Sequence, residues 1–368
     1  MEKQRICIVG DGLSGLTTAI ALNNLPNVDV ELAFKKKIKI IDNRTTAISE
    51  SNFRFLREIF TNLNSNLFWP SKKIKLFFET NKRKINFINF QEANKNLMYV
   101  YENYKLKNFL INEIKKKRIK IQKKKIESLD KLKNFDLIVL CLGRYSKLYR
   151  DITSDRIIKK DYKEIAITGH IKHNVKDLDA SQFFLKEGPL AVLPFSKNKF
   201  SFVWSLDKSF YEQNFKNIKK LVNNKIIEVL KIKKNIEITN VQSFPISMEL
   251  KKKYHKKNIL ILGEGLHTIH PIAGQGFNLV LRDIIQLQKI LRYYLKLGLN
   301  IKSSYALEDF YNNRKSENVI FGLGVDLTHN FFKYNKILDP FKKVVLKNIN
   351  RFPQFVKLTK QISNKGFI

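Results

Sequence analysis

Residues 259–283, ILILGEGLHTIHPIAGQGFNLVLRD, carry the pattern that decides the fold of this chain. An apolar, β-forming run from Ile259 to Leu262 ends in Gly-Glu-Gly. A helical pattern then begins at Phe277, directly after Gly274-Gln275-Gly276. A strand that runs into glycines and then into a helix start brings backbone N–H groups against a negatively polarised ligand. We therefore expect this segment to form one wall of a binding site.

A second segment of this kind opens the chain at residues 5–24, RICIVGDGLSGLTTAIALNN. Gly10, Gly12 and Gly15 directly follow the apolar strand Ile6–Val9 and lie at the start of a helix. In this spacing the first glycine allows a tight turn, the second lets a pyrophosphate approach the backbone, and the third lets helix and strand pack closely. Two such segments at opposite ends of one chain predict one large cofactor held from both sides.

Acidic residues near both segments are candidates for sugar contacts. A ribose-binding carboxylate is expected near the end of the second strand, where Asp29 and Glu31 are available, and we select Glu31. Glu264 follows the later strand and can accept hydrogen bonds from a sugar-like chain. Gly274 and Gly276 permit a flat ring to approach, and the dipole of the next helix favours partial negative charge on that ring.

Composition bounds the class of protein. With 368 residues and 43% hydrophobic residues, the chain can bury a sizeable core, and we expect two domains. No apolar run reaches 18 residues, and the N-terminus enters a strand directly, so we expect neither a transmembrane helix nor a signal peptide. Cys7 and Cys141 lie in apolar strand patterns, which is typical of core thiols in a reducing compartment.

The net charge of +36 raises the alternative of a nucleic-acid-binding protein. The excess of lysine, asparagine and isoleucine is spread along the whole chain, and no aromatic-basic RNA-binding motif is present. We therefore expect no nucleic-acid partner, although the charge would attract an anionic membrane surface. His267 and His270 have no further ligand at metal-binding spacing, so we expect them to shape the loop and predict no metal site.

The chain alternates strand and helix signals in an order that separates the two cofactor segments. We predict helices at 14–24, 51–64 (capped by Ser51), 104–117 and 214–231, and strands at 5–9, 28–34, 73–79, 84–90, 136–142, 162–173 and 188–206, the last a hairpin turning near 196–198. After 259–294 the remainder reads as helical. Antiparallel strands inserted between cofactor segments predict a nucleotide-binding layer with a separate sheet over the substrate.

The segment GEGLHTIHPIAGQGFNLVLRD resembles the second flavin motif of the ubiquinone-biosynthesis flavin hydroxylases, which are FAD-dependent aromatic-ring monooxygenases of the para-hydroxybenzoate hydroxylase class. Further landmarks are similar and occur in the family's order: Arg44-Thr45-Thr46-Ala47-Ile48-Ser49, Glu102-Asn103, Gly188-Pro189-Leu190-Ala191-Val192-Leu193-Pro194, and Tyr311 with Arg314. The chain departs from the family pattern at three positions. Glu264 and Leu142 each stand where the family has an aspartate, and Tyr104 stands where the family has an arginine.

The resemblance implies an α/β fold: a Rossmann-like FAD-binding domain with an inserted mixed β-sheet substrate domain and a helical C-terminus. The implied boundaries are 1–70 plus 98–160 plus 250–300 for the discontinuous FAD-binding domain, 71–97 plus 161–249 for the substrate domain, and 301–368 for the C-terminal helices. No catalytic side chain is implied, because the cofactor carries the chemistry. The implied FAD-binding residues are Gly10, Gly12, Leu13, Ser14, Gly15, Glu31, Arg44, Glu264, Pro271, Gly274, Gln275, Gly276 and Asn278.

The implied activity is hydroxylation of a polyprenylated phenol in ubiquinone biosynthesis, with NAD(P)H or another external reductant. The protein would be cytoplasmic, at the inner face of the membrane, and would contact the membrane or a ubiquinone-biosynthesis complex. Aromatic residues late in the chain are candidates for that contact: Phe331, Phe332, Phe341, Phe352 and Phe355. Two alternatives stay open, a non-catalytic scaffold of such a complex and a flavin monooxygenase acting on a soluble aromatic compound.

Overall fold

A computed structural model describes residues 3–35, 41–60, 62–80, 84–92, 94–153, 155–232, 236–274, 276–333 and 339–348. Its first layer is a six-stranded sheet with the strand order β15-β16-β9-β1-β2-β8. The strands are β1 (Gln4–Val9), β2 (Val28–Ala33), β8 (Lys120–Gln122), β9 (Leu137–Leu140), β15 (His255–Lys256) and β16 (Ile259–Ile261). All are parallel to their neighbours except the edge strand β15.

The central strands of this sheet are continuous apolar runs and are buried on both faces. This is the pattern expected of parallel strands that are covered by helices on both sides. Helices α1 (Leu13–Asn23), α2 (Glu50–Ile59), α3 (Asn103–Lys116) and α6 (Gly276–Lys296) pack around it. Helix α1 contacts both α3 and α6, and its residues 15–22 are all buried. The glycine loop before α1 is therefore held in the middle of the layer, at the carboxyl ends of β1 and β9.

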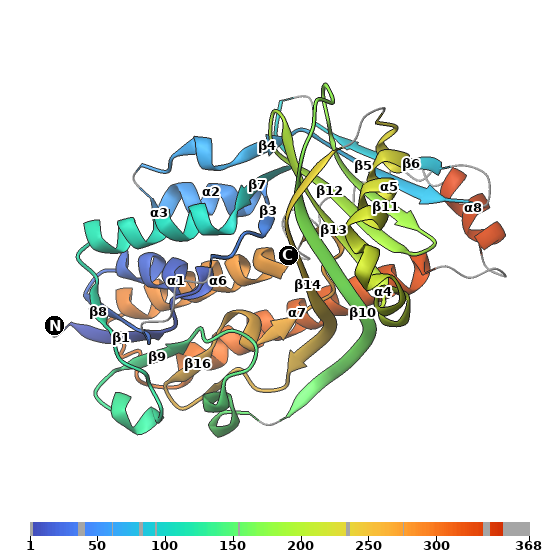
Figure 1. The fold of residues 1–368 in the computed structure, drawn as a ribbon. Helices are drawn as coiled ribbons and strands as arrows, with labels where there is room; N and C mark the ends of the chain where they lie inside the picture. The colour runs from blue at the N-terminus through green and yellow to red at the C-terminus, as the bar shows by residue number, and fades with distance from the viewer. Residues whose placement is uncertain are drawn as a thin grey trace.

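The second layer is an eight-stranded mixed sheet with the order β17-β14-β10-β13-β12-β11-β5-β6. Its strands are β5 (Lys73–Glu79), β6 (Lys84–Gln91), β10 (Arg156–Lys172), β11 (Ala180–Leu185), β12 (Gly188–Ser196), β13 (Lys199–Asp207), β14 (Glu237–Lys251) and β17 (His267–Thr268). Helices α4 (Lys208–Asn214) and α5 (Ile218–Leu230) cover one face, with Phe200, Phe202 and Trp204 fully buried beneath them. The long strands β10 and β14 run along the boundary between the two layers (Figure 1).

A three-stranded sheet of β3 (Thr45–Ser49), β7 (Met98–Glu102) and β4 (Trp69–Ser71) lies between the two larger sheets. The hydroxyls of Thr45 on β3 and Ser201 on β13 are hydrogen-bonded, so β3 is tied directly to the eight-stranded sheet. Two further helices, α7 (Tyr305–Phe332) and α8 (Asp339–Asn348), complete the described chain. No helix among the described residues is both long and apolar enough to span a bilayer.

Most predicted elements are present, and the differences have local causes. The hairpins of β5 with β6 and of β12 with β13 are confirmed, although residues 81–83 of the first turn lie outside the described residues. The predicted cap of α2 is wrong: the Ser49 hydroxyl, not that of Ser51, accepts from the Asn52 N–H, and the helix ends at Ile59. The predicted helix 214–231 is divided into the end of α4, a short 3-10 turn and α5.

Candidate functional site

The loop between β1 and α1 is shaped by two glycines that no other residue could replace. At Gly10 φ is +130°, and a β-carbon there would lie 2.1 Å from the carbonyl oxygen of Cys141 on the neighbouring strand end. A β-carbon at Gly15 would lie 2.1 Å from the carbonyl oxygen of Gly10. These contacts hold the start of α1 tightly against β1 and β9, as the glycine spacing predicts.

The N-terminus of α1 faces free space. Nothing lies within 4 Å of a β-carbon built on Gly12, and no side chain caps the helix. The first helical hydrogen bond runs from the N–H of Leu16 to the carbonyl of Gly12, so the N–H groups of Leu13, Ser14 and Gly15 precede the ladder. Together with the helix dipole, this arrangement suits a phosphate group.

The second glycine segment meets the first. Gly263 has φ +84°, and its backbone lies so close to Ser14 that a β-carbon there would be 3.0 Å from the Ser14 hydroxyl. The next residue, Glu264, is exposed in a 3-10 turn, and α6 begins at Gly276 with open space around it. Gly274, with φ +65°, lies beside Ala47 of β3. The tertiary fold therefore brings the two glycine segments, which are about 250 residues apart in the sequence, into contact.

Arg44 lies just before β3 and is held in a fixed position. Its guanidinium makes a two-pronged ion pair with Asp42, with both nitrogen–oxygen distances at 2.8 Å. Asp42 also accepts from the Asn103 amide at 3.0 Å, which links this pair to the start of α3. Hydrogen bonding to Asp42 raises the pKa of Arg44, and the charge of Glu264 adds to this effect. The positive charge of Arg44 therefore lies within electrostatic range of Glu264 in the second glycine segment.

Two predicted residues have their side chains engaged within the protein. The amide of Asn278 donates to the Ala47 carbonyl at 2.9 Å and accepts from the Ser49 N–H at 2.8 Å, so it fastens the start of α6 to β3. Pro271 lies in the loop before α6, and its carbonyl accepts from the Gly274 N–H at 3.0 Å. The predicted contact at Gln275 falls outside the described residues.

Glu31 is not at the end of β2, where the ribose-binding acid was expected. It lies two residues before the end of the strand and is only 7% exposed. Its carboxylate accepts from Arg5 at 3.1 Å, from Lys120 at 3.2 Å and from Gln122. The carboxylate joins β1, β2 and β8 through these contacts, which compete with the predicted ribose contact; that contact stays a prediction. Asp29, the other candidate, is exposed and paired with Lys3.

The first histidine of the loop belongs to a buried ionic network. His267 Nε2 is 2.5 Å from a carboxylate oxygen of Asp283, which is fully buried on α6. The other oxygen of Asp283 accepts from Arg314 Nε at 2.7 Å and from Asn318 at 3.2 Å, both on α7. The motif residues His267, Asp283 and Arg314 are therefore partners in one network that joins the loop, α6 and α7.

The second histidine belongs to a buried cluster that spans both layers. Glu164 of β10 is 3.1 Å from His270 Nε2 and 2.9 Å from His329 Nε2 of α7. A bulge in β10, with Lys163 at φ +53°, precedes Glu164. Burial by itself would raise the pKa of Glu164, but hydrogen bonds from the two imidazoles outweigh burial and lower the pKa to about 2.

This cluster has the composition of a metal site, since its ligating atoms all lie within 4.8 Å of one another. Its hydrogen bonds indicate another role. The N–H of Ile272 donates to His270 Nδ1 at 3.3 Å, so the ring proton resides on Nε2, which donates to Glu164. That nitrogen then has no lone pair for a metal. The cluster instead fastens the loop before α6 to the eight-stranded sheet, through Glu164 and His329, which sequence spacing did not connect to His270.

Tyr149 is a further residue beside the glycine segments, and no sequence pattern predicted it. Its hydroxyl accepts from the Leu142 N–H at 3.0 Å and donates to the Gly143 carbonyl at 2.9 Å. Its ring lies so close to Gly265 that a β-carbon there would clash with it. Tyr149 thus packs the end of β9 against the second glycine segment. No local pattern marks it, because its partners are backbone groups brought together by the fold.

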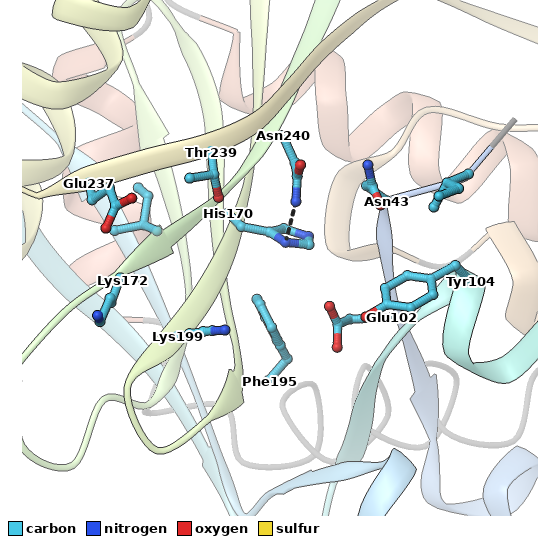
Figure 2. A pocket seen from close by; sticks show the side chains of 12 residues that line it. Asn43, Glu102, Tyr104, His170, Lys172, Phe195, Lys199, Glu237, Thr239 and Asn240 are labelled. Carbon is cyan, nitrogen blue, oxygen red and sulfur yellow. Dashed lines mark hydrogen bonds between the residues drawn. The ribbon is translucent and has the colours of Figure 1, made fainter.

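A cavity of about 610 Å³ opens beside Arg44, between the two layers. Figure 2 shows the side chains of Asn43, Glu102 and Tyr104 on one side of it, and those of His170 and Phe195 on the other. The remaining lining residues are Ile41, Ile171, Lys172, Lys199, Glu237, Thr239 and Asn240. Strands of the inserted sheet therefore form one wall of the cavity, and the segments that flank Arg44 form the other.

Comparison with known proteins agrees with this architecture. Residues 135–359, more than half of the chain, match the family model described as squalene epoxidase. The ubiquinone biosynthesis monooxygenase COQ6 of Schizosaccharomyces pombe is 29% identical over 194 residues, which cover 42% of this chain and 40% of that protein. The 3-demethoxyubiquinol 3-hydroxylase of Escherichia coli is 30% identical over 162 residues, with 42% and 40% covered. The match spans less than half the length of these curated relatives.

Solved structures with the same fold extend over almost the whole chain. The p-nitrophenol 4-monooxygenase PnpA of Pseudomonas putida superposes with a TM-score of 0.76 at 13% identity, covering 99% of this chain and 100% of that one. HpxO of Klebsiella pneumoniae, solved with FAD and uric acid, gives a TM-score of 0.74 at 12% identity and covers 99% and 97%. At this level of identity the likeness concerns the fold.

Proposed function

The chain belongs to the squalene epoxidase family, and from this premise we propose that it is an FAD-dependent monooxygenase acting in ubiquinone biosynthesis. Its substrate would be the aromatic ring of a polyprenylated phenol, and NAD(P)H or another external reductant would supply electrons. The similarity to COQ6 and to the 3-demethoxyubiquinol 3-hydroxylase supports this reaction class. The observation that carries the proposal is the meeting of two glycine segments at Gly263 and Ser14.

The residues around these segments fit FAD. The uncapped N-terminus of α1 and the open space at Gly12 suit the pyrophosphate. Arg44, whose guanidinium is paired with Asp42, would bring positive charge near the phosphates, and the exposed carboxylate of Glu264 would accept from ribityl hydroxyls. The glycines at 274 and 276 leave room for a flat ring beside Ala47. Because the Glu31 carboxylate is paired with Arg5 and Lys120, the hydroxyls of the adenosine ribose would form hydrogen bonds with backbone groups.

When bound, FAD would supply the oxygen-activating chemistry that no side chain can provide. The protein's part is to orient the two reactants and to exclude water. Asn278 and the Glu164–His270–His329 cluster hold the loop before α6 against β3 and β10. The cavity beside Arg44 would receive the substrate ring. We propose the division expected from sequence, in which 1–70, 98–160 and 250–300 bind FAD and 71–97 with 161–249 cover the substrate.

A lipid-like substrate would require contact with a membrane, and α7 offers a suitable face. Ile320, Leu323, Leu327 and Phe331 recur at helical spacing and are exposed by 39–68% of their surface. On α8, Phe341, Val344 and Val345 are also exposed. Phe332 was expected to join this surface, but it stacks on Phe184 in the core, and Phe352 and Phe355 lie outside the described residues. We propose that this face, on a protein of charge +36, contacts an anionic membrane.

The test is FAD binding by a variant that fills the phosphate site without disturbing the fold. Gly12 has φ −74°, and a β-carbon there contacts nothing, so Gly12→Ala should fold normally. We expect the wild-type protein to take up FAD near one to one, measured by its visible absorption, and Gly12→Ala to bind FAD at least tenfold more weakly. Gly324→Ala, on the open face of α7, is the matched control and should bind like wild type.

Two results would contradict the proposal. If wild-type protein takes up no flavin in excess FAD, the monooxygenase is excluded and the scaffold alternative is favoured. If Gly12→Ala binds FAD as tightly as Gly324→Ala does, the N-terminus of α1 does not hold the pyrophosphate.

A further inference from the structure

His170 on β10 is a buried polar side chain with an unused hydrogen-bonding atom. It is only 7% exposed, and its ring lies against that of Phe195 with 4.8 Å between ring centres. Asn240 donates to Nδ1 at 3.4 Å, but Nε2 has no hydrogen-bond partner within the described part of the chain. Buried polar atoms are almost always paired, so an unpaired one beside a cavity calls for a ligand or water as its partner.

The imidazole projects into the cavity. In Figure 2 the ring of His170 extends from β10 into the space bounded by Asn43, Glu102 and Phe195. The backbone of Asn43 lies close enough to the ring to raise its pKa, but Nε2 has no partner at hydrogen-bonding distance and angle within the described residues. The ring is therefore positioned to contact whatever enters between the inserted sheet and the segment that carries Arg44.

The protonation state of His170 makes Nε2 a donor. Burial lowers the pKa of His170 and is the largest influence; Glu102 and the nearby Asn43 backbone raise the pKa, and Lys199 and Lys105 lower it. The ring is thus neutral near pH 7. Because Nδ1 accepts from Asn240, the one ring proton resides on Nε2. The cavity therefore contains a neutral N–H group that requires an acceptor.

We propose that this cavity binds an oxygen-bearing aromatic ring, which packs against Phe195 while its ring oxygen accepts from His170 Nε2–H. The proposal rests on the proposed function and names the group that recognises the substrate ring. A phenol supplies both the flat apolar face and the acceptor. A donor at its oxygen would also favour ionisation of the phenol, and the ring of a phenolate is more electron-rich than that of a neutral phenol. Lys172 and Lys199 are exposed at the mouth, outside this contact.

The experiment measures binding of a small ring probe to the purified full chain, with FAD content recorded separately. Isothermal titration calorimetry with 4-methylphenol, and with toluene as the analogue without an oxygen, would compare wild type with three variants. His170→Leu removes the donor, whereas His170→Gln retains an N–H at nearly the position of Nε2. His173→Leu is the matched control, because His173 is buried just after β10 with an unpaired Nε2 but does not line the cavity.

We expect wild type to bind 4-methylphenol more tightly than toluene. His170→Leu should weaken 4-methylphenol binding by roughly three- to tenfold, the effect of one neutral hydrogen bond, and leave toluene binding unchanged. His170→Gln should stay close to wild type, and His173→Leu should match it.

Equal affinity of wild type and His170→Leu for 4-methylphenol would overturn the proposal, as would equal losses in the leucine and glutamine variants. Failure of wild type to bind FAD would instead contradict the proposed function. The calorimetric comparison distinguishes the two, because the probe binds to side chains of the protein itself.

Discussion

Glu164→Gln removes the charge that holds the loop before α6, and we predict that it lowers the free energy of unfolding by about 3 kcal/mol at pH 7. The carboxylate accepts from His270 and His329, and its pKa falls from 4.5 to about 2 in the folded protein. Each pKa unit corresponds to about 1.36 kcal/mol of preference for the charged form. Glutamine has nearly the same shape but no charge, so this preference is lost.

The same reasoning predicts how the difference depends on pH. Because the folded-state pKa of Glu164 is depressed, its contribution to stability is fully present above 4.5 and is lost as the pH falls toward 2. Urea unfolding of wild type and Glu164→Gln at several pH values should therefore show a gap of about 3 kcal/mol at pH 7 that narrows steadily below pH 5.

Glu212→Gln is the control, since Glu212 is exposed on α4 and its one ion pair among the described residues, to Lys208, is 3.9 Å long. Its effect should stay below about 0.5 kcal/mol. A gap between wild type and Glu164→Gln that is constant from pH 7 to pH 3 would refute the reasoning, because the effect would then arise from packing and not from a stabilised charge.

Three other perturbations test the structure. Arg314→Leu removes the cation that pairs with the fully buried Asp283, so it should lower the free energy of unfolding in urea by about 3–5 kcal/mol. A loss below about 1 kcal/mol would contradict the role of this network. Leu327→Asp should weaken sedimentation with phosphatidylglycerol vesicles about tenfold, whereas Leu297→Asp, exposed outside the α7 face, should not. Burial raises the pKa of the Cys7 and Cys141 thiols to about 12, so both should react with a thiol reagent only after unfolding.

Local patterns were enough to predict the elements on either side of the first glycine segment. The glycine spacing at 10, 12 and 15 predicts a strand, a tight turn and a helix, because only glycine tolerates φ +130° at Gly10 and the close contact at Gly15. The β12–β13 hairpin follows from apolar segments around a short polar turn. The conformation of these elements is determined by residues close together in the sequence, so local sequence patterns are sufficient to predict them.

Strand β14 and the cap of α2 were harder to predict because their determinants are distant. Strand β14 was not predicted, since 237–251 is mixed in polarity and owes its strand conformation to pairing with β10. The Ser49 cap depends on where β3 ends, and β3 ends where Asn278 of α6 accepts from the Ser49 N–H. The sequence offers both Ser49 and Ser51, and the tertiary contact decides between them.

The amino-acid sequence by itself determined the two glycine segments, the order of the elements and the family resemblance. Each of these rests on residue types at short spacing. Only the tertiary structure decided that Glu31 is an internal ion-pair partner, that Glu164 and His329 hold His270, and that His170 faces a cavity. The role of a charged or polar side chain depends on its burial and its partners. Those partners lie as many as 165 positions away, so no local pattern specifies them.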